Sequence, residues 1–342
     1  MLKRVAKTVL IVFFLLYQVA VNYVVAEETI VRVAVRAHNG EEVSHSKWGE
    51  TMDYLSQKIP GHRFVMMPFV HNSALLQAVS QGDFNFVLTN PAAFVELQMR
   101  YGAKPLATLI NKRQGKGYMQ FGSVIFTRAD RTDIADYDGL KGKIFMAVDE
   151  KGFGGWLVAW QELLENKLDP FLDFAEVRFA GGLQEKVVYA VRDGKVDAGS
   201  VRTDMLERLA SKGLITLADF KVLGLKEQKE FPFLLSSRLY PEWSFSQTKS
   251  TSNQLGAQVL NALRDIRANH SAAKKGKYVG WIKSLDYSSV RELMEDLQVG
   301  PFHMTSYDAW EVFWRQYKYY LLAFVLGVIV LLYVVLLGAR KK

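Results

Sequence analysis

The sequence predicts an α/β protein of two similar lobes with a cleft between them, followed by a C-terminal transmembrane helix. Three observations lead to this prediction. Of the 342 residues, 49% are hydrophobic and 13% aromatic, which is enough to build sizeable cores. A short motif recurs once, 112 residues further along the chain. Near the C-terminus, the 19 residues from Tyr319 to Leu337 carry no charge.

The recurring motif is AVSQGDFN at residues 78–85, which returns as AVRDGKVD at residues 190–197. Two apolar stretches and their counterparts keep nearly the same spacing: 31–35 with 144–148, and 64–67 with 176–179. Two short apolar strands always look alike, but the shared pattern Ala-Val-x-x-Gly-x-x-[Asn/Asp] favours a true repeat. Each half therefore reads as strand, helix, strand, helix, strand, helix.

Apolar residues at helical spacing support the helices of both halves. In the first half they fall at i, i+4, i+7 and i+11, namely at Trp48, Met52, Leu55 and Ile59. A similar stripe in the second half consists of Trp156, Trp160, Leu163 and Leu164. Asn72-Ser73 precedes a further apolar face, and we predict that this pair caps that helix.

Two βαβαβ halves imply two α/β lobes. In such sheets ligands bind beyond the carboxyl ends of the strands, so two lobes with facing ends form a cleft. Residues 122–127 and 230–237 look extended, and we predict that they cross between the lobes as a hinge. The expected layout is lobe 1 at 27–127, lobe 2 at 128–229 and a return to lobe 1 at 230–305.

The N-terminus predicts a secretory signal peptide over residues 1–26. Basic residues precede an apolar run, and small residues then stand before a cleavage point after Ala26. The alternative is an uncleaved anchor, because the apolar run from Val9 to Val25 is close to the length that spans a bilayer.

The C-terminal apolar run predicts a single transmembrane helix at 319–337. It is long enough to cross one hydrocarbon core. A juxtamembrane linker at 306–318 precedes it and contains aromatic residues typical of a membrane interface, including Trp310 and Trp314. A basic tail at 338–342 follows. Because basic residues stay in the cytoplasm, we expect the tail inside and the body exported.

Composition excludes several classes of function. The net charge is +8, but six basic residues lie at the two ends, so the body is nearly balanced and shows no nucleic-acid footprint. The chain has no cysteine, which excludes disulfides and thiolate metal sites. The 6 histidines are scattered, and no nucleophile-elbow, zincin or P-loop motif occurs. We therefore expect no enzyme activity, no metal and no cofactor.

Several short segments carry a resemblance to a known family. They are TNP at 89–91, VIFTRAD at 124–130, FGGW at 153–156, VRTDMLER at 201–208 and RLYPEW at 238–243. From about Thr29 to Phe302 the body resembles the phosphonate-binding family of periplasmic type II solute receptors. It is most similar to the version that forms the sensor region of tetrathionate-type sensor histidine kinases. The resemblance implies a type II two-lobed fold, with the body in the periplasm and the anchor in the inner membrane.

The sequence also departs from this family in two places. In the phosphonate importers, a hydroxyl cluster at the start of a lobe 2 helix cradles the anion. At the matching place this chain has EKGFGG at residues 150–155, with no hydroxyl and with a carboxylate. The kinases also continue past the membrane helix, whereas five residues follow Leu337 here. The resemblance therefore implies a separate kinase-type partner and leaves the ligand open.

The expected ligand-binding residues lie at the strand ends that face the cleft. They are Arg36, His38, Thr89, Asn90, Tyr118, Lys151, Gly152, Phe153, Gly154, Gly155, Arg202 and Thr203. Arg202 is the principal candidate, because a guanidinium offers a planar fork to an anion; the alternative is an ion pair with Asp204 or Glu207. The glycines of the turn allow backbone N–H groups to approach an anion; the alternative is an ordinary turn. Hinge packing is the alternative for Tyr118, and plain solvent exposure is the alternative for Lys151 and His38.

Three functions fit these features. The first is a membrane-anchored periplasmic receptor that binds a small anionic solute and signals to a separate kinase-type partner. The second is the tethered binding component of an ABC importer for phosphonate, phosphate or another oxyanion, with a permease as partner. The third is a ligand-free domain used for assembly, whose cleft its own side chains fill.

Overall fold

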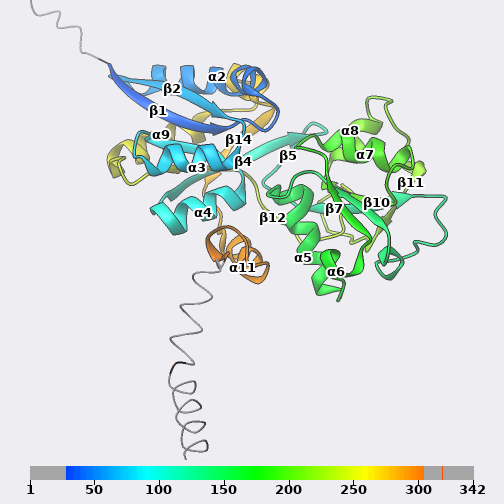
Figure 1. The fold of residues 1–342 in the computed structure, drawn as a ribbon. Helices are drawn as coiled ribbons and strands as arrows, with labels where there is room; N and C mark the ends of the chain where they lie inside the picture. The colour runs from blue at the N-terminus through cyan, green and yellow to red at the C-terminus, as the bar shows by residue number, and fades with distance from the viewer. Residues whose placement is uncertain (1–27, 304–317, 319–342) are drawn as a thin grey trace, which may run out of the picture.

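The structure is a computed structural model that describes residues 28–303 and Lys318. It shows two α/β lobes beside each other, with the chain crossing between them (Figure 1). The two-lobed α/β fold predicted from the sequence is therefore confirmed. The predicted signal peptide at 1–26 and transmembrane helix at 319–337 lie outside the described residues. Among the residues that are described, no helix is both long enough and apolar enough to cross a membrane.

Lobe 1 is built on a seven-stranded sheet in the order β14-β4-β13-β3-β1-β2, with β5 paired to β4. Strands β2, β1 and β3 run parallel, and β13, β4 and β14 add to them in antiparallel pairs. The strands are β1 (Thr29–Arg36), β2 (His62–Phe69), β3 (Phe86–Thr89), β4 (Lys104–Arg113), β5 (Lys116–Tyr118), β13 (Ser244–Gln247) and β14 (Tyr278–Lys283). The helices are α2 (Glu41–Lys58), α3 (Asn72–Ser80), α4 (Pro91–Tyr101), α9 (Asn253–Asp265), α10 (Ser271–Gly276) and α11 (Ser288–Asp296), with the 3-10 turn η4 (Gly300–Phe302).

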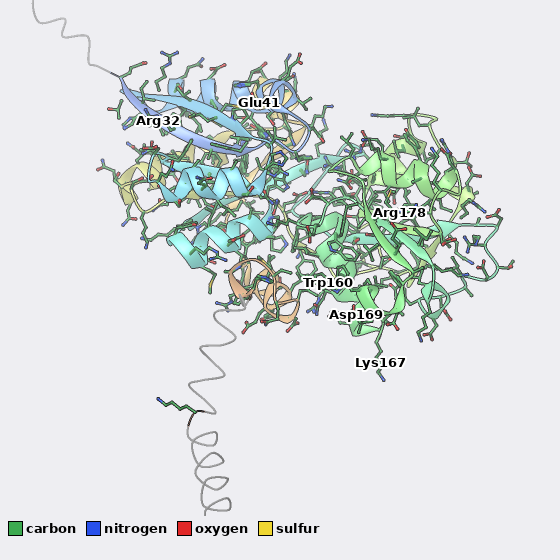
Figure 2. All side chains as sticks on the ribbon, viewed as in Figure 1. Arg32, Glu41, Trp160, Lys167, Asp169 and Arg178 are labelled. Carbon is green, nitrogen blue, oxygen red and sulfur yellow. The ribbon has the colours of Figure 1, made fainter. Side chains whose placement is uncertain are left out.

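Lobe 2 has a five-stranded sheet in the order β11-β7-β10-β8-β9. Its strands are β7 (Ser123–Arg128), β8 (Ile144–Ala147), β9 (Glu176–Phe179), β10 (Ala198–Arg202) and β11 (Phe220–Leu223). Its helices are α5 (Val158–Glu165), α6 (Pro170–Asp173), α7 (Gln184–Arg192) and α8 (Met205–Ala210), with 3-10 turns η1 (Asp138–Leu140) and η3 (Leu217–Asp219). A π-helical turn, η2 (Phe153–Leu157), leads into α5. Figure 2 shows Arg32 and Glu41 on lobe 1, and Trp160 and Arg178 on lobe 2.

The sequence repeat corresponds to equivalent structure in the two lobes. Gly82 and Gly194 lie two residues after the last residues of α3 and α7, and both have positive φ, of 83° and 68°, which would strain a residue with a side chain. Three residues later, the Asn85 side chain accepts a hydrogen bond from the Arg32 N–H at 2.9 Å. The Asp197 side chain does the same for the Ile144 N–H at 2.8 Å. The motif therefore ties the end of a helix to the first strand of each half.

The crossings lie a few residues from where the sequence suggests. Strand β7 belongs to the sheet of lobe 2, so the outward crossing precedes Ser123. Residues 230–237 run beside β7, where the Ser236 N–H donates to the Ser123 carbonyl at 2.9 Å, and they form no strand of their own. The lobes are instead connected through a two-stranded antiparallel sheet of β6 (Gln120–Phe121) and β12 (Tyr240–Pro241), which is where the predicted hinge would lie.

One hydrophobic core is shared by both lobes. Helices α4 and α11 of lobe 1 contribute Phe94 and Leu293, while lobe 2 contributes Phe153 and Trp156, and all four side chains are buried. Beside this core, the Gln161 side chain of α5 donates to Asp296 of α11 at 3.1 Å. The remaining buried clusters lie within single lobes. The lobes are thus joined along one side by apolar packing.

Candidate ligand-binding cleft

A cavity of about 220 Å³ opens between the two lobes. Nine of the twelve predicted residues line it: Arg36, His38, Asn90, Lys151, Gly152, Phe153, Gly154, Gly155 and Arg202. Lobe 1 contributes the ends of β1 and β4 and one face of α2. Lobe 2 contributes the turn after β8, the start of α7 and the end of β10. The strand-end rule thus brings residues far apart in sequence to one cavity.

The other three predicted residues do not line the cavity. Thr89 is fully buried at the end of β3, where it pairs with Ser244 of β13. The Tyr118 ring packs edge-on against Phe233, with ring centroids 5.0 Å apart, so it has a packing role. Thr203 is buried, and its hydroxyl accepts a hydrogen bond from the Gly122 N–H at 3.2 Å.

The Arg202 guanidinium already has carboxylate partners. It pairs with Glu242, which follows β12, and its Nε lies 3.4 Å from Asp204 Oδ1. Its Cζ also lies 4.0 Å from the centroid of the Phe121 ring, within the range of a cation–π contact. Burial would raise the pKa of Glu242, but the charge and hydrogen bonds of Arg202 outweigh burial and lower it. The carboxylate therefore stays ionised and holds the guanidinium in place.

A second ion pair crosses between the lobes. Arg113, at the end of β4, places its Nε 2.5 Å from Asp204 Oδ2. Asp204 stands just before α8 with φ of 74°, an uncommon conformation for a residue with a side chain. Glu242 is fixed in turn by Asn111, whose side-chain amide donates to it at 2.9 Å. These contacts form one charged network across the cleft floor.

The glycine-rich turn is shaped by close packing. A Cβ on Gly154 would lie 2.5 Å from the Phe121 ring, and a Cβ on Gly155 would lie 2.4 Å from a Val148 methyl group. Neither residue tolerates a side chain without movement of its neighbours. The helix that follows starts as the π-turn η2, in which Trp156 and Leu157 N–H groups both bond to the Gly152 carbonyl. The glycines let the turn approach the hinge as well as the cavity.

Lys47 is a cleft residue that the sequence analysis did not single out. It lies in the middle of α2, and its Nζ is 4.5 Å from the centroid of the Trp48 ring and 5.8 Å from that of Trp243. Withdrawal from water lowers its pKa to about 7, and the nearby charge of Arg113 adds to this effect. Within the described part of the chain Lys47 forms no ion pair.

Two further basic residues lie on lobe 1. The Arg36 guanidinium donates hydrogen bonds to the carbonyls of Phe69 and Val70. The negative charge of Asp149 interacts with it electrostatically, but the two side chains form no close ion pair. Withdrawal from water in the cleft lowers the pKa of His38, although more than a third of its surface is exposed, and the charge of Lys47 lowers it further. His38 is therefore neutral at physiological pH and packs 5.5 Å from the Trp243 ring.

Other lining residues also lacked a clear signal in the sequence. They include Asn72, Asn111, Arg113, Gln184, Arg208 and Trp243. The predicted cap at Asn72-Ser73 was wrong: both residues lie within α3, which begins without a side-chain capping bond, and Asn72 lines the cleft. An asparagine at a helix start that caps nothing is a signal visible only in the structure. The Trp243 position, in contrast, belonged to a segment already noted in the sequence.

A two-lobed α/β fold with a lined cavity between the lobes is typical of solute-binding proteins. Residues 33–308 match the family described as the periplasmic substrate-binding protein of phosphonate ABC transporters. The chain belongs to this family. The resemblance inferred from the sequence is thus confirmed.

Known relatives come from both sensors and transporters. The chain is 35% identical over 271 residues to the tetrathionate sensor histidine kinase TtrS of Salmonella typhimurium, a match that covers 79% of this chain and 44% of that protein. The chain thus spans less than half the length of this relative.

Solved structures share the fold at low identity. PhnD1 from Prochlorococcus marinus, in complex with methylphosphonate, has a TM-score of 0.60 and 14% identity, covering 79% of this chain and 99% of that one. A binding-protein component of an ABC phosphonate transporter from Pseudomonas aeruginosa has a TM-score of 0.62 and 16% identity, covering 79% and 87%. A protein from Xanthomonas citri bound to ATP has a TM-score of 0.60 and 17% identity, covering 78% and 95%.

Proposed function

We propose that the chain is a membrane-anchored periplasmic receptor for a small anionic solute. The observation that supports this most is the cationic lining of the interlobe cavity, which includes Arg36, Lys47, Lys151 and Arg202. Opposite charges attract strongly in a cleft partly withdrawn from water. The volume of the cavity disfavours a ligand-free assembly domain, because about 220 Å³ between the lobes is not filled by the protein's own side chains.

A thermal-shift screen tests the anion proposal. The full chain in detergent is mixed with sulfate, thiosulfate, tetrathionate, phosphate, methylphosphonate, acetate and malonate, at constant ionic strength. A true ligand raises the midpoint in a concentration-dependent way, since it binds only the folded state. A set of cationic and neutral solutes serves as control. If only those solutes stabilise the chain, it is not an anion receptor.

We propose that ligand binding is passed to a separate kinase-type signalling partner through the predicted helix at 319–337. The identity to a sensor kinase over the binding domain supports this function. The matching family description supports the alternative, in which the chain delivers its ligand to an ABC permease. Crosslinking in cells followed by mass spectrometry separates the two: recovery of a histidine kinase supports signalling, and recovery of a permease supports transport.

The proposed anchor has its own test. A reporter that is active only in the cytoplasm, fused after Lys342, should be active, because the basic tail is expected inside. The same reporter fused within the body, at the exposed Leu172, should be inactive. An inactive C-terminal fusion that is well expressed would contradict the topology.

A further inference from the structure

The cationic groups of the cleft differ in whether a carboxylate already neutralises them. Arg113 and Arg202 are held in ion pairs by Asp204 and Glu242. Arg36, Lys47 and Lys151 also line the cavity, but none of them forms an ion pair within residues 28–303. The second set is therefore the one with charge left for a ligand.

Lys47 stands out within that set. Its ammonium lies 4.5 Å and 5.8 Å from the centroids of two indole rings, and the residue is half-buried. Lys151, in contrast, is exposed, and Arg36 donates to two backbone carbonyls. A partly buried cation without a counter-ion is costly, and a bound anion removes that cost. Arg202, in contrast, must first give up Glu242, which is fully buried, before it can turn to a ligand.

The charges of the cleft do not balance. Six cationic side chains line it: Arg36, Lys47, Arg113, Lys151, Arg202 and Arg208. Two carboxylates, Asp149 and Glu185, also line the cavity. Two others, Asp204 and Glu242, do not line it but form ion pairs with Arg113 and Arg202. Among the described residues, an excess of two positive charges remains, and Ser44 is the single hydroxyl that lines the cavity. Recognition in such a site depends on charge more than on hydroxyl hydrogen bonds.

We infer that the ligand is a small dianion and that Lys47 of lobe 1, rather than Arg202, makes its principal charge contact. The inference rests on the proposed anion-receptor function. In this arrangement Arg202 and Glu242 remain paired and set the geometry of the hinge. The ligand's second charge lies toward Arg36 and Lys151, which line the same cavity from lobe 1 and lobe 2.

The test compares dianions with matched monoanions on the full chain in detergent. Sulfate is paired with methanesulfonate, and malonate with acetate; thiosulfate is added as a third dianion. Each dianion should bind more tightly than its monovalent partner. Lys47→Met should lower the affinity for the tightest-binding dianion by about 30-fold or more, while Lys47→Arg should keep much of that affinity. Lys58→Met is the control, because Lys58 is on the same helix but its side chain is 51% exposed and outside the cavity.

A second measurement does not depend on a variant that folds. Lysine acylation by acetic anhydride, read by mass spectrometry, should fall at Lys47 when the tightest dianion is present and stay constant at Lys58. The inference is wrong, and the receptor function stands, if that anion leaves Lys47 reactivity unchanged or binds Lys47→Met with wild-type affinity. Equal binding of the monovalent partner would also overturn it. If no anion binds the wild type, the inference and the proposed function both fall.

Discussion

The two sides of the interface between the lobes are built from different chemistry. On one side, α4 and α11 pack against η2 and α5 through buried apolar residues such as Phe94 and Trp156. On the other side, Arg113 and Arg202 reach across to Asp204 and Glu242 beside the cavity. The hinge strands β6 and β12 lie between, where Phe121 belongs to the apolar core and also lines the cavity.

This difference suggests that the two sides of the interface have different roles. Apolar packing is non-directional and insensitive to pH, so it can hold the lobes together in any state of the cleft. Ion pairs respond to a new charge nearby, because their energy depends on distance and on the local dielectric. We therefore expect changes on the apolar side to affect stability, and changes on the charged side to affect ligand response.

The largest expected effect comes from the apolar side. Trp156→Ala removes a fully buried indole from the core that both lobes share, and should lower the free energy of unfolding by about 3–5 kcal/mol. Urea unfolding followed by circular dichroism measures this. Phe171→Ala is the control, since Phe171 contacts the same indole but is 54% exposed. Equal losses in the two variants would show that the shared core is not the main source of stability.

The next effect comes from the charged side. Glu242→Gln leaves the half-buried Arg202 with Asp204 alone, and should cost about 2–3 kcal/mol. The matched control is Glu165→Gln, which breaks the exposed pair with Arg238 and should cost less than about 1 kcal/mol. The same unfolding assay compares them. If Glu242→Gln leaves the free energy of unfolding unchanged, this ion pair does not fix the hinge.

A smaller effect is expected at the glycine turn. Gly154→Ala places a Cβ 2.5 Å from the Phe121 ring, so the hinge must shift, at a cost of about 1–3 kcal/mol. Gly49→Ala, in the middle of α2 with open space around its Cβ, should instead stabilise the chain by about 0.5–1 kcal/mol. Thermal unfolding should therefore give shifts of opposite sign. A shift of the same sign in both would contradict the packing described for the turn.

The last effect concerns pH. The pKa of Lys47 is about 7 in the folded chain, below its unfolded value, so the unfolded state binds more protons between pH 7 and the usual lysine range. Ligand-free stability should rise across that window from this group, while anion affinity should fall. The surrounding charges are Arg113, Glu242, Arg202 and Lys277. Lys47→Met should flatten both trends; trends that persist unchanged would assign them to another group.

Much of the fold follows from the sequence because periodicity and the repeat are local signals. The strands at 31–35, 64–67 and 176–179 each fall inside an observed strand. The positions of the strand ends then predicted many of the residues that line the cavity, since the carboxyl ends of the strands converge there. Arg202 was placed in the cleft, and its pairing with Asp204 was foreseen as the alternative.

What the sequence could not predict depends on contacts between distant residues. The partner Glu242 lies 40 residues from Arg202, and no spacing rule connects them. In the sequence Lys47 is indistinguishable from a solvated lysine on a helix. Its proximity to Trp243 exists only after α2 packs against the sheet of lobe 1. The core shared by the lobes was missed for the same reason, since helix periodicity shows an apolar face but not its partner.

The most direct test of the receptor account is the distance between the lobes with and without an anion. The chain has no cysteine, so two introduced cysteines at the exposed Glu41 of α2 and Lys186 of α7 carry spin labels uniquely. The account predicts that the anion with the largest stabilising effect shifts the mean distance between the two labels by more than about 2 Å. A pair within lobe 1, at Glu41 and Lys58, should not change. An anion that binds tightly and leaves the interlobe distance unaltered would contradict a receptor that works by closure of its lobes.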